Sequence, residues 1–101
     1  MRTLLKISMD VEKASRAIQD GSMQRVMNSV LDEIHPEAAY FTAEHGRRTA
    51  FIFFDLADPS QIPAIAEPFF STLGAEIELS PVMNRDDLKK GLQNFSVKKA
   101  A

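Results

Sequence analysis

Residues 48–55 read RTAFIFFD and place apolar side chains on both faces of a predicted β-strand. Successive side chains of a strand point to opposite faces, so Phe51 and Phe53 share one face while Ile52 and Phe54 share the other. A chain of 101 residues can usually cover one face of a sheet with its own helices. The second apolar face therefore needs a second subunit, a ligand or both.

A tight turn before this strand predicts how it pairs with the strand at 38–43. Gly46 can take the positive φ that a tight turn requires, and the turn is expected to centre on His45 and Gly46. That register places Tyr40 opposite Phe51 on one face. It also pairs Thr42 with Thr49, Phe41 with Ala50, and Ala39 with Ile52. A slip of one residue would exchange the two faces of the strand.

Two long helices with one apolar face each are predicted, at 22–34 and within 58–73. In both, apolar residues follow the i, i+3, i+4, i+7 spacing of a helix that buries one side. A short helical segment that Asp10 can cap precedes the first long helix, and turn-forming residues at 20–22 predict a break between the two. Pro36 ends the first long helix. Asp58 can cap the second helix, whose internal prolines predict a bend or a late start.

Strands at 2–9 and 75–79 complete the order β-α-β-β-α-β. This order is that of the split βαβ, ferredoxin-like fold. We therefore expect an α+β protein with a four-stranded antiparallel sheet and two main helices on one face, the whole chain 1–101 forming one domain. Asn84 can cap a short C-terminal helix, in which Leu88, Leu92 and Phe95 share the apolar side and after which the tail frays.

Composition and charge narrow the classes of partner. The formal net charge is −2, and acidic and basic residues are interspersed, so the chain lacks the basic stripe that nucleic-acid binding requires. It has no cysteine, which excludes disulfides, thiolate nucleophiles and sulfur-ligated zinc. Arg2 and Lys6 interrupt the first apolar run before it reaches the length of a signal peptide. We expect a cytoplasmic protein with neither a membrane nor a nucleic-acid partner.

The two faces of the predicted sheet differ in what can cover them. The helix side is expected to hold Leu5, Ile7, Phe41, Ile52, Phe54, Ile77 and Leu79. The other face is expected to hold Leu4, Tyr40, Phe51 and Phe53. Arg2 and Lys6 are expected beside Glu76 and Glu78, where they form either cross-strand ion pairs or a charged pocket wall. Three aromatic side chains alone would leave on the order of 500 Å² uncovered. An apolar centre inside a charged rim is typical of a protein interface, so we predict a homodimer through this face.

Four segments carry a resemblance to a known family. EAAYFT at 37–42, RTAFIFFD at 48–55, DPSQIPAIAEPFF at 58–70 and IELSPVM at 77–83 are similar to a family of small uncharacterised bacterial proteins. In architecture the chain resembles the dimeric α+β barrel superfamily, in which two ferredoxin-like subunits pack sheet on sheet. That superfamily includes muconolactone isomerase and cofactor-free monooxygenases. The resemblance implies a homodimer and transfers no catalytic residue.

Two functions remain open. The first is a small-molecule-binding module that accommodates an apolar molecule between helices and sheet. The second is a cofactor-independent enzyme, of the isomerase or monooxygenase type, acting on a small carbonyl or aromatic substrate. The predicted ligand-binding or interface residues are Tyr40, Arg48, Phe51 and Phe53. No cofactor or metal is expected.

Few side chains are candidates for chemistry. Glu67, beside Pro68, would be a general base if the helix bend turned it toward the sheet, and a solvated carboxylate otherwise. His45 has two possible roles. It would act as a general acid or base, with Arg48 binding an anionic group, or it would be a solvated turn residue without a catalytic role. His35 is expected to cap a helix end. Met9, Met23 and Met27 are expected to pack in the core.

Overall fold

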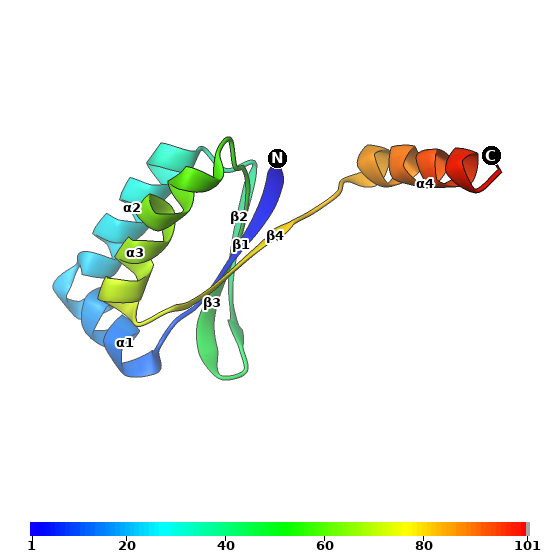
Figure 1. The fold of residues 1–101 in the computed structure, drawn as a ribbon. Helices are drawn as coiled ribbons and strands as arrows, with labels where there is room; N and C mark the ends of the chain where they lie inside the picture. Colours follow the sequence, from blue (N-terminus) through cyan, green and yellow to red (C-terminus); the bar gives the residue numbers. More distant parts are fainter. Residues whose placement is uncertain (101) are drawn as a thin grey trace.

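The chain folds into a four-stranded antiparallel sheet with helices on both of its sides. The computed structural model describes the backbone of residues 1–100 and the side chains of residues 1–96. The strands lie in the order β2-β3-β1-β4. Helices α1, α2 and α3 pack on one side of the sheet, and α4 projects away from the sheet on the other side (Figure 1). The elements are β1 (Arg2–Ser8), α1 (Val11–Asp20), α2 (Ser22–Ile34), β2 (Ala38–Glu44), β3 (Arg47–Asp55), a 3₁₀ turn (Pro59–Gln61), α3 (Ile62–Leu73), β4 (Glu76–Pro81) and α4 (Arg85–Ala100).

The hairpin between β2 and β3 has the predicted register. His45 and Gly46 both take positive φ, at 54° and 75°, which gives the tight turn between the two strands. Tyr40 pairs with Phe51. The other predicted pairs, Thr42 with Thr49, Phe41 with Ala50 and Ala39 with Ile52, are also confirmed. The side chains of β3 are therefore divided between the two faces as the sequence predicts.

The helix ends follow local signals in the sequence. Gly21, with φ of 83°, separates α1 from α2 and confirms the predicted break. The Asp58 carboxylate accepts from the Ser60 N–H at 2.8 Å, and the Gln61 side-chain oxygen accepts from the Asp58 N–H at 3.1 Å. This capping box belongs to the 3₁₀ turn, so α3 begins only at Ile62, which is the late start that the prolines predict.

The core fills the space between the sheet and helices α1–α3. Its largest fully buried side chains are Leu5, Ile7, Ile52, Phe54, Phe69 and Leu73. Phe41 was expected among them, but its side chain is 57% exposed. It alternates onto the helix side as predicted, yet β2 is an edge strand, and Phe41 lines a cleft beside α2 instead of lying beneath it.

Helix α4 differs most from expectation, because it is long and projects from the sheet. It runs for 16 residues, to Ala100, where a short helix ending near Phe95 was predicted. Asn84 caps it as expected, its side-chain oxygen accepting from the Asp87 N–H at 2.8 Å. The molecule extends 60 Å along its longest axis and 28 Å along the next. None of the helices in the described part of the chain combines the length and apolar character needed to cross a membrane.

Candidate functional site

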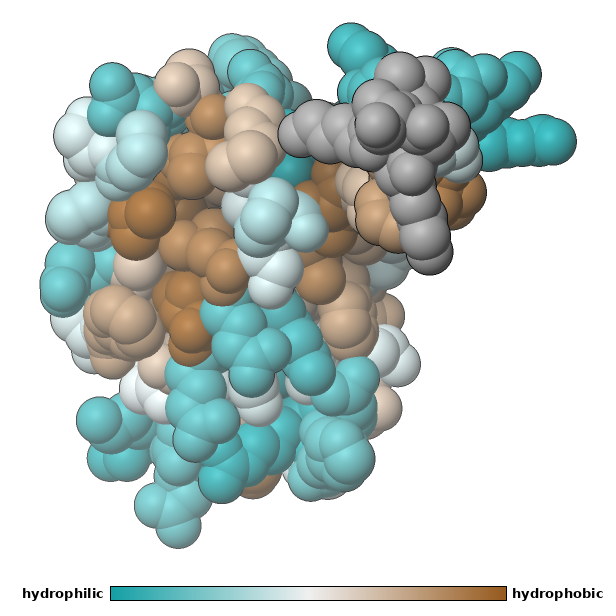
Figure 2. Space-filling model, turned by 45° about the vertical axis from the view of Figure 1, so that its right-hand side comes forward, coloured by the Kyte–Doolittle hydropathy of each residue, from teal (hydrophilic) through white to brown (hydrophobic). Residues whose placement is uncertain are grey.

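The side of the sheet away from α1–α3 carries the predicted apolar cluster. Leu4 pairs with Phe53 and Tyr40 with Phe51, so the four side chains form one patch, called the open face below. Leu4, Phe51 and Phe53 are half-buried by their neighbours, and Tyr40 is 64% exposed. The visible side in Figure 2 has hydrophobic residues gathered in the half nearest α4 and hydrophilic residues in the half that holds the β2–β3 hairpin.

Charged residues surround the open face, with partners other than those predicted. Lys6 lies opposite Glu78 on β4, but its ammonium makes an ion pair with Glu44 at 2.7 Å. The hydrogen bond from Lys6 lowers the pKa of Glu44, and the same bond raises the pKa of Lys6. Long side chains reach past their cross-strand neighbours, so register alone does not settle ion pairs. Arg2 likewise pairs with Glu37 at 2.6 Å and Asp87 at 3.0 Å.

A polar pocket of about 340 Å³ lies where the hairpin meets β4. The His45 side chain lies at this pocket, is 90% exposed and has its Nε2 atom 3.8 Å from the Glu44 carboxylate. The lining residues are Lys6, Ser8, Glu44, His45, Arg47, Glu76 and Glu78. Three carboxylates face one ammonium and one guanidinium here, so the pocket has a small net negative charge and offers no attraction to an anion.

A second cleft, of about 490 Å³, lies on the helix side at the sheet edge, and apart from Arg48 its lining residues were not predicted as a site. Its apolar wall is formed by Met9, Met23, Met27 and Phe41, and we call it the methionine cleft. The methionines do pack against the core as expected, but Met23 and Met27 are only partly buried. The sequence signal for this cleft is an aromatic residue, Phe41, on an edge strand. Helices cover the side chain of such a residue only from the interior side of the sheet, so its other side remains open to solvent.

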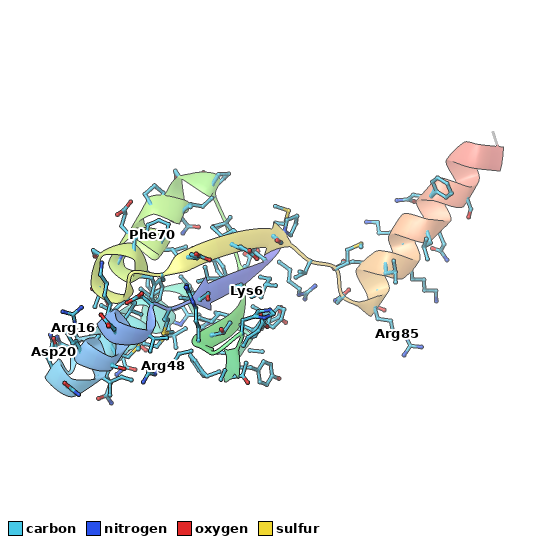
Figure 3. All side chains as sticks on the ribbon, turned by 90° about the horizontal axis from the view of Figure 1, so that it is seen from below. Lys6, Arg16, Asp20, Arg48, Phe70 and Arg85 are labelled. Atoms are coloured by element: carbon cyan, nitrogen blue, oxygen red, sulfur yellow. The ribbon has the colours of Figure 1, made fainter. Side chains whose placement is uncertain are left out.

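Arg48 belongs to the methionine cleft and not to the open face. Its Nη1 atom donates to the Ser15 hydroxyl at 3.2 Å and to the Val11 carbonyl oxygen at 3.4 Å. These bonds hold the guanidinium beside α1, as Figure 3 shows. Side chains alternate along β3, so Arg48 lies on the face opposite Phe51 and Phe53. The four predicted ligand or interface residues are thus divided between two surfaces.

The candidate catalytic residues do not converge. Glu67 is exposed on α3, so its carboxylate is not buried against the sheet. His45 lies in the hairpin turn, and Arg48 lies beside α1. His35 takes the C-cap position of α2, which is the predicted position, and its backbone N–H donates to the Leu31 carbonyl oxygen at 3.0 Å. Among the described residues, no observation brings together the groups that the enzyme alternative requires.

Comparisons with known proteins add little to this geometry. No family model matches the chain, and no curated protein matches it. Among solved structures, a de novo designed protein, Ferredog-Diesel, is similar over 80% of this chain and 85% of its own, with 9% sequence identity and a TM-score of 0.48. Within the described residues, no group of three or more His, Cys, Asp or Glu side chains is placed to hold a metal ion.

Proposed function

We propose that the protein is a homodimeric, ferredoxin-like module of the dimeric α+β barrel type, and that it binds a small apolar molecule bearing an anionic group. The order β2-β3-β1-β4, read from the other edge, is β4-β1-β3-β2, as expected when two split βαβ units interleave. This order and the antiparallel pairing of every neighbouring strand support the fold.

The apolar open face is the observation that most supports a homodimer. Its centre is apolar and its rim is charged, which is how the core and rim of protein interfaces differ. Helices α1–α3 pack on the other side of the sheet, so a second copy of the chain is the partner that supplies the same apolar surface. Two copies related by a two-fold axis would each bury Leu4, Phe51 and Phe53 against the other.

Light scattering on Phe53→Glu tests the dimer. A carboxylate at the centre of the interface would be desolvated without a partner, so we expect the dimer Kd to rise more than about 100-fold, or about 2.7 kcal/mol. Phe70→Glu is the matched control, because Phe70 is exposed on α3. A wild-type protein that stays monomeric at every concentration, or a Phe53→Glu protein that dimerises normally, would contradict the proposal.

The methionine cleft is the proposed ligand site. Thioether and aromatic groups can adapt to the apolar part of a ligand, and Arg48 stands at the cleft to bind an anionic group. Both observed side-chain bonds of Arg48 use Nη1. A guanidinium has five N–H donors, so Arg48 can also donate to a carboxylate or sulfonate.

Titration with anilinonaphthalene sulfonate, an apolar anion, tests the ligand site. We expect Arg48→Gln to weaken binding about tenfold and Met27→Asp to weaken it at least as much, because each removes one part of the recognition. Arg47→Gln is the control, since Arg47 lies outside the cleft, in the polar pocket. The titration is repeated with Phe53→Glu to separate binding of the probe at the methionine cleft from binding at the open face. Equal affinity in wild type, Arg48→Gln and Met27→Asp would disprove this site.

A further inference from the structure

We propose that the groove between α2 and α3 is a second ligand site, which binds a small organic cation with an apolar body. The groove has a volume of about 330 Å³, and its lining residues all differ from those of the methionine cleft. The two sites would therefore take ligands of opposite charge. The proposal depends neither on the dimer nor on ligand binding in the methionine cleft.

The floor of the groove is apolar and reaches the core. Helices α2 and α3 lie side by side on the sheet (Figure 1). Val30 on α2, Phe54 on β3 and Ile65 on α3 line the groove, and all three are buried. Ligand pockets of about 300–1,000 Å³ combine such an apolar lining with a few placed polar groups. The groove is at the lower end of this range, so it suits a small body such as a single aromatic ring.

Two residues of α3 give the groove space and a hydrogen-bond acceptor. Ala64 and Pro68 are four residues apart, lie on the same side of the helix and both line the groove. Proline has no N–H, so the Ala64 carbonyl oxygen lacks the donor that residue 68 of a regular helix would supply. A backbone carbonyl oxygen is a strong acceptor that a ligand N–H can use instead. The groove thus has an acceptor beside its apolar floor.

The charged side chains of the groove are acidic. Glu33 and Asp55 line it, whereas none of the described lysine, arginine or histidine side chains does. Asp55 already binds the N-terminal ammonium. The Glu33 carboxylate takes part in none of the ion pairs and side-chain hydrogen bonds within residues 1–96, so it is the group available to a ligand. One available carboxylate is too few ligands for a metal ion, so the cation that fits is an organic one.

The position of Glu33 on α2 also favours a bound cation. Glu33 lies in the last turn of α2 with Asp32, and that turn has no basic residue. The C-terminal end of a helix carries a partial negative charge, so carboxylates are unfavourable there and a cation is favourable. The N-terminal end of α3 has the opposite polarity, but the capping box of Asp58 already occupies donors there. A cation in the groove would therefore offset a repulsion built into α2.

Three ligands with one ring and different charges test the site by NMR of the full chain. Benzamidine is a cation at neutral pH, benzamide is neutral and benzoate is an anion. We expect benzamidine to bind with a Kd of about 1 mM or lower, at least about tenfold more tightly than either of the others. Its binding should shift the backbone amide signals of residues 29–34 and 64–67. No binding below about 10 mM, shifts confined to other residues, or equal affinity for benzoate would overturn the proposal.

Matched variants at exposed positions separate the carboxylate from the apolar groove. Glu33→Gln should weaken benzamidine binding about tenfold and leave benzamide binding unchanged. Asp32→Asn removes a charge from the same turn outside the groove and should change benzamidine affinity less than about twofold. Ala64→Leu should fill the groove and weaken both ligands at least about tenfold, whereas Ser71→Leu, elsewhere on α3, should affect neither. Equal effects of Glu33→Gln and Asp32→Asn, or full affinity in Ala64→Leu, would refute the site.

Discussion

The two faces of β3 have similar side chains and very different surroundings. Ile52 and Phe54 are 0% and 2% exposed beneath the helices, whereas Phe51 and Phe53, on the same strand, are only half-buried. The free energy gained by hydrophobic burial is proportional to the apolar area removed from water. The helix side, where more area is buried, therefore contributes most to the stability of the subunit. The open face contributes little until another surface covers it. The difference shows where folding of one chain ends and where assembly is expected to begin.

The largest effect is expected from Phe54→Ala on the helix side. Removing a fully buried aromatic ring should lower the free energy of unfolding by about 3–5 kcal/mol, because the cavity left behind adds to the lost burial. Urea denaturation measures this loss, which should be the same at low and high protein concentration. A loss below about 1 kcal/mol would mean that the helix side is not the main core.

Phe51→Ala on the open face should behave differently. In the monomer the free energy of unfolding should fall by less than about 1 kcal/mol. At concentrations where the dimer forms it should fall by about 2 kcal/mol, because only in the dimer is the ring fully buried. Urea denaturation at two protein concentrations gives both values. An equal loss at both concentrations would mean that the open face is not an interface, and the contrast between the faces would then be one of exposure only.

Gly46→Ala tests the turn that keeps the two faces apart. Gly46 has φ of 75°, and an added Cβ atom would meet nothing within 4 Å, so the cost is confined to the backbone. We expect a loss of about 1 kcal/mol with unchanged pairing of β2 and β3, read by thermal unfolding and amide hydrogen exchange. Gly91→Ala, in α4, should not be destabilising, since alanine favours a helix. Altered exchange protection in β3 would indicate a slipped register.

The smallest effect is expected from the ion pair at the rim of the open face. The folded-state pKa of Glu44 lies below its ordinary value, so the pair stabilises the fold above that ordinary pKa, near 4.3. The contribution is lost as the pH falls through the lowered pKa. Glu44→Gln should therefore be slightly less stable than wild type at pH 7, and the difference should narrow as the pH is lowered below that ordinary pKa in thermal unfolding. A difference that does not narrow at low pH would assign another role to Glu44.

Features with local signals could be predicted from the sequence. The hairpin register depends on two adjacent residues, His45 and Gly46, whose backbone conformation a short turn requires. The break at Gly21 and the capping box of Asp58 depend on residues within one turn of each other. In such places, steric preference and nearby hydrogen bonds dominate over contacts from distant parts of the chain.

Features that depend on distant elements could not be predicted in the same way. Alternation correctly placed Phe41 on the helix side, but its exposure depends on where α2 lies relative to the sheet edge. Arg48 reaches Ser15, which is 33 residues earlier in the chain. The Leu88 and Leu92 spacing predicted a helix without indicating that α4 would stand apart from the sheet. The methionine cleft is formed by α2, β2 and β3, which are distant in sequence, so no short stretch of the chain predicts it.

The interior position of β1 has a consequence for how the chain is made. Leu5 pairs with Ile52 on one side and with Leu79 on the other, so β1 acquires its neighbours only after β3 and then β4 have been synthesised. A hairpin such as β2–β3 closes in about 1–10 µs, whereas pairing across such long separations slows folding. We therefore expect the nascent chain to carry β1 unpaired, with its apolar side chains exposed, until β3 has been made, which is when a chaperone would bind it.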